Sequence, residues 1–148
     1  MTSITAAPSG PELSAAQVAS AVTRPATALT RGLLAIVRCA SRLDSCVLAD
    51  QRAAQAEVQA VKLLGDNIKA LQASNRVPEA VKALLDETGK DANAIVDLSV
   101  PDVQVFACGP GSSTWPDNQD ECARRYQALG QAARKLVETL QQWDAYSG

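Results

Sequence analysis

Residues 117–143 read DNQDECARRYQALGQAARKLVETLQQW and carry the clearest structural pattern in the chain. Apolar residues recur at alternating intervals of four and three: Cys122, Tyr126, Leu129, Ala133, Leu136, Leu140 and Trp143. This spacing is typical of a helix that buries one face. Asp117 is a suitable N-cap, and Asp120 and Glu121 place negative charge in the first turn, where the helix dipole favours it. The segment therefore predicts a long, packed helix.

The same spacing predicts three further long helices upstream. Their apolar series are Leu29, Leu33, Ile36, Ala40, Leu43 and Val47; then Ala54, Val61, Leu64, Ile68 and Leu71; then Val81, Leu84, Leu85, Thr88, Ala92 and Ile95. Before them a short helix can open at Pro11, or at a capping box formed by Ser14 and Gln17. Proline is tolerated in the first turn of a helix but not in its interior. Pro25 is therefore expected to begin a new helix.

These segments predict an all-α fold: an antiparallel up-down bundle of four long helices plus a short N-terminal helix. Most connections are short, but residues 102–117 form one long loop before the last helix. The 148 residues are expected to fold as a single domain spanning 1–148, with residues 1–11 as a flexible lead-in.

Composition excludes several classes of function. Hydrophobic residues make up 47% and charged residues 20% of the chain, which is typical of a soluble globular protein. No apolar run approaches the roughly 20 residues of a membrane span, and the N-terminus lacks the features of a signal peptide. A net charge of −2 argues against a nucleic-acid binder. The absence of histidine excludes Ser-His-Asp and Cys-His catalysis, and no cofactor is indicated.

The four cysteines are spaced too widely for a zinc site, which uses closely spaced pairs. Cys39 and Cys46 would lie about 10 Å apart on a straight helix, so they can pair only if the chain turns between them. Cys108 and Cys122 bracket the long loop and form a second candidate pair. Two local disulfides favour an exported mature protein over a cytoplasmic one. The alternative is four reduced cysteines used as small core residues.

Two surfaces are candidate binding sites. Phe106 and Trp115 lie in the long loop that ends at Asp117, and they either anchor a protein interface or fold back to plug the end of the bundle. Arg24, Arg31 and Arg38 recur every seven residues and share one helix face, the basic stripe. It is either a solvated face or a site for an acidic partner or a small dianion.

Each predicted long helix also contains one interior glycine: Gly32, Gly65, Gly89 and Gly130. An interior glycine costs on the order of 1 kcal/mol relative to alanine, so each needs an offsetting role. Close approach of two helix backbones is one explanation. Room for a ligand between helices is the other.

In layout the chain is similar to the plant pectin methylesterase and invertase inhibitors, on the segment from Cys39 to Cys46, CASRLDSC. The resemblance implies a four-helix bundle whose N-terminal helical hairpin is closed by a disulfide, and it concerns architecture only. The all-α chorismate mutases are a second comparison. Their helix-one motif is absent here, although Arg31, Arg42, Lys62 and Glu57 could imitate a charged pocket.

The first functional hypothesis is a non-enzymatic interaction module that binds a protein partner through the loop 102–117 and the last helix. The alternative is a carrier or sensor that holds a small apolar ligand between glycine-thinned helices. A small all-α enzyme of the chorismate-mutase type is the third.

Overall fold

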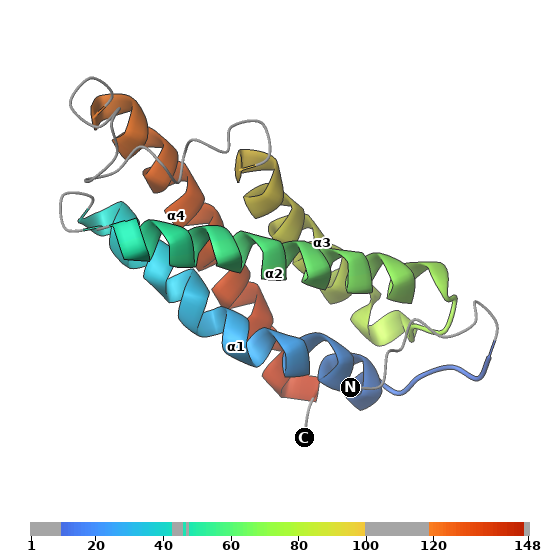
Figure 1. Ribbon diagram of the computed structural model, residues 1–148. Helices are drawn as coiled ribbons and strands as arrows, with labels where there is room; N and C mark the ends of the chain where they lie inside the picture. The colour runs from blue at the N-terminus through green and yellow to red at the C-terminus, as the bar shows by residue number, and fades with distance from the viewer. Residues whose placement is uncertain (1–9, 43–45, 47, 100–118, 147–148) are drawn as a thin grey trace.

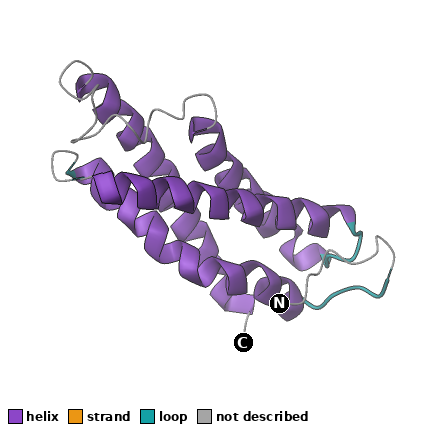
Figure 2. Cartoon of the chain, in the orientation of Figure 1, coloured by secondary structure: helices purple, strands orange, loops and turns teal. Residues whose placement is uncertain are grey.

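The computed structural model describes residues 10–42, 46, 48–99 and 119–146. Within these residues the fold is all-helical and contains no strand (Figure 2). Its elements are α1 (Ala15–Ser41), α2 (Leu48–Ala73), α3 (Glu79–Ser99), α4 (Gln119–Gln142) and the short 3-10 helix η3 (Trp143–Tyr146). The prediction of an all-α protein with four long helices is confirmed. None of these helices is both long and apolar enough to cross a membrane.

The helices pack around one apolar core. α1 contacts α2 and α4, and α3 contacts the same two helices, whereas α1 and α3 scarcely touch (Figure 1). Every member of the apolar series predicted for α2 and for α4 is buried, including Trp143 at the start of η3. Burying one leucine-sized side chain fully stabilises a fold by about 1.5–3 kcal/mol. These apolar faces therefore supply most of the free energy that holds the helices together.

The prediction that Pro25 separates a short N-terminal helix from a longer one is wrong. α1 starts at Ala15 from the Ser14–Gln17 capping box and runs through Pro25 without a break. Proline has no N–H, so the carbonyl of Ala21, four residues earlier, loses its usual helical donor. The side-chain amide of Asn67 on α2 donates to that carbonyl at 3.3 Å. A neighbouring helix thus satisfies the group that proline leaves unpaired.

This compensation predicts a coupling between the two residues. Asn67→Ala should lower the free energy of unfolding by about 1 kcal/mol, because the Ala21 carbonyl then has neither donor. Pro25→Ala restores the backbone N–H and removes a helix-interior proline, so it should stabilise the protein by up to about 3 kcal/mol. In the Pro25→Ala background, Asn67→Ala should cost less than half of what it costs alone. Urea denaturation of the four proteins measures the coupling, and additive effects would contradict this account.

A disulfide closes the turn between α1 and α2. Cys39 and Cys46 are bonded, with their Cα atoms 5.0 Å apart, as the sequence predicts for a chain that reverses between them. In the chain-entropy model a loop this short stabilises the fold by about 2.5 kcal/mol. Cys122 is buried and is also disulfide-bonded. Cys108, its predicted partner, lies outside the described residues.

Three of the interior glycines mark close contacts between helices. A Cβ atom built on Gly130 would lie 2.5 Å from Cβ of Ala40, which sets the approach of α4 to α1. One on Gly89 would lie 3.1 Å from Cγ2 of Ile68, and one on Gly65 would lie 3.4 Å from Oδ1 of Asn93. The contact at Gly130 agrees with the close-approach explanation, whereas the 3.4 Å distance at Gly65 is an ordinary van der Waals contact.

Candidate functional site

The residues singled out from the sequence fall into two groups. Phe106, Trp115 and Asp117 lie outside the described residues, so their roles stay predictions. Arg24, Arg31 and Arg38 all lie on α1 and are all exposed. Because α1 is continuous, the three arginines follow one another along a single helix face at intervals of about 10.5 Å.

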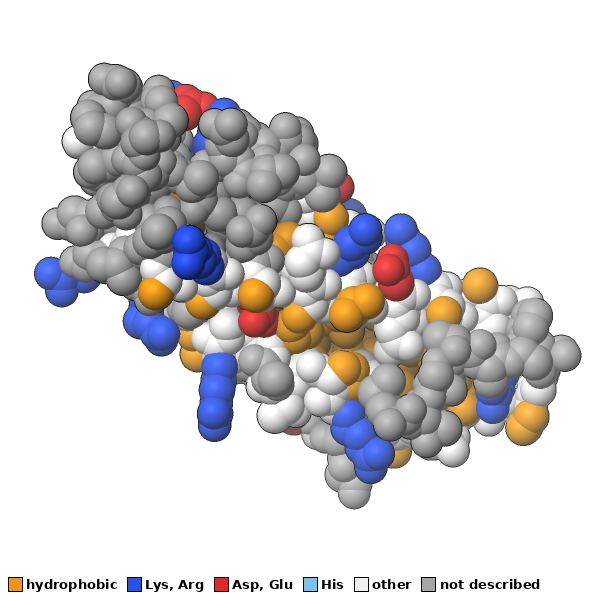
Figure 3. All heavy atoms as spheres, in the orientation of Figure 1, with side chains coloured by type: hydrophobic (Ala, Val, Ile, Leu, Met, Phe, Trp, Pro, Cys, Tyr) orange, Lys and Arg blue, Asp and Glu red, His pale blue; other side chains and the backbone are white. Residues whose placement is uncertain are grey.

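The basic stripe runs along the outside of the molecule. In Figure 3, Lys and Arg side chains project from the border along which α1 runs in Figure 1. Leu34 lies between Arg31 and Arg38 on the same face, and 44% of its surface is exposed. The stripe thus combines three cations with one exposed leucine.

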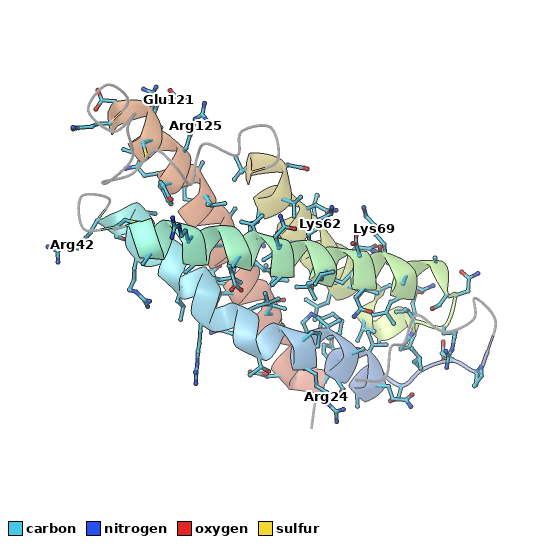
Figure 4. The ribbon with its side chains drawn as sticks, viewed as in Figure 1. Arg24, Arg42, Lys62, Lys69, Glu121 and Arg125 are labelled. Carbon is cyan, nitrogen blue, oxygen red and sulfur yellow. A yellow bond between two sulfur atoms is a disulfide. The ribbon has the colours of Figure 1, made fainter. Side chains whose placement is uncertain are left out.

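The charge balance of α1 differs from that of α3 and α4. On those two helices every Lys and Arg has an acidic residue three or four positions away. Several of them form ion pairs. Lys82 lies 3.1 Å from Glu79, and Lys135 lies 2.8 Å from Glu87. Glu121 pairs with Arg124 at 2.5 Å and with Arg125 at 2.9 Å, and Figure 4 labels Glu121 and Arg125. α1 contains no acidic residue at all. Within the described part of the chain, none of the three stripe arginines forms an ion pair.

A carboxyl group is inserted between α1 and α2. A Cβ atom on Gly32 would overlap the carboxylate of Glu57, so glycine at that position makes room for it. Oε1 of Glu57 is buried and has no hydrogen-bond partner in the part of the chain that the structure describes. Burial raises the pKa of Glu57 to about 7. The sequence alone does not reveal this pair, because only packing brings Gly32 and Glu57 together.

The raised pKa predicts a pH dependence of stability. The folded state holds the Glu57 proton more tightly than the unfolded chain does. The stabilisation that comes from protonated Glu57 is therefore fully present below about pH 4.5 and is lost as the pH rises through about 7. Glu57→Gln keeps the shape of the protonated side chain and cannot ionise. Its free energy of unfolding should match that of the wild type at pH 4.5 and exceed it at pH 8 by on the order of 1 kcal/mol. This figure is already reduced for the partial exposure of Glu57.

Thermal or urea denaturation at the two pH values measures the difference. Glu138→Gln makes the same chemical change on the exposed face of α4 and serves as the control. If the two variants have the same pH profile, Glu57 is not the group that titrates.

The charged set that could imitate a chorismate-mutase pocket is not brought together. Arg31, Arg42 and Lys62 are all exposed, whereas Glu57 is half-buried. Figure 4 places Arg42 at the end of α1 and Lys62 on the side of α2 turned away from α1. Glu57 has no described cationic partner, since desolvation alone accounts for its raised pKa.

A buried polar network joins α3 to α4 and η3. The indole N–H of Trp143 donates to Oγ1 of Thr88 at 3.0 Å, and Thr88 donates to the carbonyl of Leu84 at 2.7 Å. One turn along, Thr139 donates to Oδ2 of Asp91 at 2.5 Å. Buried polar groups that are all hydrogen-bonded fix the alignment of two helices. This network is therefore structural.

Lys135 extends this network to the surface. Its ammonium group lies 2.8 Å from a carboxylate oxygen of Glu87 and 3.5 Å from one of Asp91. The hydrogen bond between Lys135 and Glu87 lowers the pKa of Glu87 and raises that of Lys135. Both side chains of this pair are solvated, so the pair adds little to stability.

Two open grooves flank α3. One, of about 550 Å³, lies between α2 and α3 and includes Lys69, Asp86 and Lys90 among its lining residues. The other, of about 590 Å³, lies between α3 and the C-terminal end of the chain, at Leu84 and Tyr146. Oppositely charged side chains line the first groove, and both grooves are open to solvent. Neither is the enclosed apolar cavity that a carrier of a small apolar ligand needs.

Comparison with family models, with curated proteins and with solved structures finds nothing that matches the chain.

Proposed function

We infer that this protein is a non-enzymatic interaction module: an antiparallel up-down helical bundle that presents the basic stripe of α1 to an acidic surface of a protein partner. One observation carries this proposal. Arg24, Arg31 and Arg38 are exposed on a helix without acidic residues, and none of them pairs with a described carboxylate. The cations of α3 and α4, by contrast, have acidic neighbours on their own helix.

The way α1 is held makes the stripe suited to binding. The helix packs against α2 and α4 on its buried side, and the disulfide ties its end to α2. The backbone positions of the three arginines are therefore fixed, and each guanidinium group can bind a carboxylate with two parallel hydrogen bonds. One exposed ion pair contributes little, but several cations on one face steer an acidic partner and raise its association rate.

The other two hypotheses have less support. A carrier of an apolar ligand needs an enclosed apolar cavity, yet the groove between α2 and α3 is open to solvent and is lined in part by Lys69, Asp86 and Lys90. An enzyme of the chorismate-mutase type needs its charged residues to converge, and the candidate set diverges.

The proposal predicts that binding depends on the stripe. A variant carrying Arg24→Glu, Arg31→Glu and Arg38→Glu should retain the wild-type melting temperature within a few degrees, because all three side chains are exposed. Immobilised wild type should capture a partner from an extract of cells that make the protein, and the triple variant should lose it. Capture by the wild type should also weaken between about 0.05 and 0.5 M salt.

The matched control carries Lys62→Glu, Lys69→Glu and Lys90→Glu. These exposed residues lie on α2 and α3, and the control changes the net charge by the same amount. Quantitative mass spectrometry compares the three captures. A partner that the two triple variants lose equally is responding to net charge, and this result would contradict a role for the stripe itself.

The loop 102–117 and the start of α4 form the second proposed contact surface, on sequence grounds. Tryptophan on a long loop is a typical interface anchor. Trp115→Ala should therefore leave the helical circular-dichroism signal and the melting temperature nearly unchanged while it reduces capture of the same partner. A large loss of thermal stability would instead identify Trp115 as a plug at the end of the bundle.

A further inference from the structure

We propose that the segment bound by the basic stripe is an amphipathic helix with acidic residues at every seventh position, which lies along α1. This inference rests on the proposed function and adds the conformation and the spacing of the partner segment. It follows from the pattern of the described residues on the outer face of α1.

The outer face of α1 repeats with the spacing of a helix-packing seam. Its exposed residues alternate by three and four: Arg24, Thr27, Arg31, Leu34, Arg38 and Ser41. The buried face follows the same rhythm on the opposite side, through Val22, Ala26, Leu29, Leu33 and Ile36. Two helices that pack along each other over several turns have apolar residues at this spacing. The buried face of α1 meets that condition, whereas its outer face has the same spacing with Leu34 between arginines.

Three described residues lie between or beside the arginines on this face: Thr27, Leu34 and Ser41. The hydroxyls of Thr27 and Ser41 donate to the backbone carbonyls of Thr23 and Val37, both at 3.0 Å, and so are already engaged with α1 itself. Leu34 offers an apolar contact in the middle of the stripe. A partner residue next to Leu34 is thus expected to be apolar, with acidic residues on either side.

The spacing of the cations selects a helix over a strand. Seven residues of a helix rise about 10.5 Å, so acidic residues seven apart on a partner helix meet arginines seven apart on α1. In a strand, residues on one face are about 6.6 or 13 Å apart, and neither interval fits. A strand can match one arginine but drifts out of register at the next.

A membrane surface fits the stripe less well. A helix that lies on a bilayer buries its apolar face among the lipids, but the apolar face of α1 is already in the core. The three cations alone would contribute only about 1 kcal/mol each near an anionic surface. An acidic helix engages the arginines and Leu34 together.

The test uses two synthetic helical peptides of identical composition. One has glutamate at every seventh position with leucine between, and the other has glutamate at every fifth position, which places successive carboxylates on different faces. At low salt the wild-type protein should bind the first peptide at least about ten-fold more tightly than the second. The stripe triple variant should bind both equally weakly, and the Lys62, Lys69 and Lys90 control should bind like the wild type. Fluorescence anisotropy measures each Kd.

A leucine pair tests the packing part of the proposal. Leu34→Ala should weaken binding of the first peptide by about three-fold or more. Leu98→Ala, on α3 and with a similar exposed fraction of 42%, should leave it unchanged. Equal effects of the two substitutions would show that Leu34 is not part of the interface and would contradict packing of the partner along α1.

Three other outcomes would also overturn the helical partner: equal binding of the two peptides, tighter binding of an acidic proline-rich peptide, or binding only to vesicles that contain phosphatidylserine. If any of these occurs while the stripe variant still loses its captured partner, the conformation proposed here is wrong and the interaction module stands. If the stripe variant captures the partner normally, the proposed function itself fails.

Discussion

The hydrogen bond from Asn67 to the carbonyl of Ala21 is the contact on which the rest of α1 depends. Pro25 removes the donor that this carbonyl would have within a helix, and an amide from α2 replaces it. Without that replacement the Ala21 carbonyl would have no described donor, and leaving it unsatisfied would cost stability. The buried face and the basic stripe of α1 both continue past this point. The inter-helix hydrogen bond therefore stabilises α1 where its own backbone lacks a hydrogen bond.

Three of the four neighbouring pairs of helices are aligned by different contacts. α1 and α2 share the disulfide, the Asn67 bond and the Glu57 carboxyl that occupies the space at Gly32. α3 and α4 share the buried hydrogen bonds of Thr88 and Asp91. α1 and α4 have the contact between Gly130 and Ala40, which brings the two backbones close. Apolar burial holds the helices together, and these polar and steric contacts determine how they are aligned.

Among the contacts within the core, Glu57 stands out. Oε1 of this half-buried residue has no hydrogen-bond partner among the described residues, although most buried polar atoms in proteins are paired. At neutral pH this costs stability, and nothing in the described packing recovers it. The outer face of α1 shows the opposite situation, with exposed cations that form no ion pair within the described residues. The Glu57 carboxyl group affects how α1 packs against α2, whereas the arginines determine what α1 presents to solvent.

The sequence predicted features that depend on residues close together in the chain, and it did not predict those that depend on contacts between helices. The seams of α2 and α4 and the capping box at Ser14 follow from spacing along one helix, so periodicity predicted them. The Cys39–Cys46 bond was one of two interpretations of the cysteines, and it required the chain to turn between them. The predicted helix break at Pro25 is wrong because Asn67 donates to the Ala21 carbonyl, 46 residues away in sequence, in place of the missing backbone N–H. The candidate site divides in the same way: seven-residue spacing placed the three arginines on one face, but it could not show that no carboxylate from another helix would cover them.

The sequence by itself determined that this chain is helical, where its apolar faces lie and which cations share a face of α1. These properties depend on the identity of residues three, four or seven positions apart, and a helix repeats at those intervals whatever it packs against. Only the tertiary structure decided that α1 passes through Pro25, that Gly32 receives the carboxyl of Glu57 and that the basic stripe stays exposed. Each of these results depends on which helix lies beside which, and that is set by side chains distant in sequence.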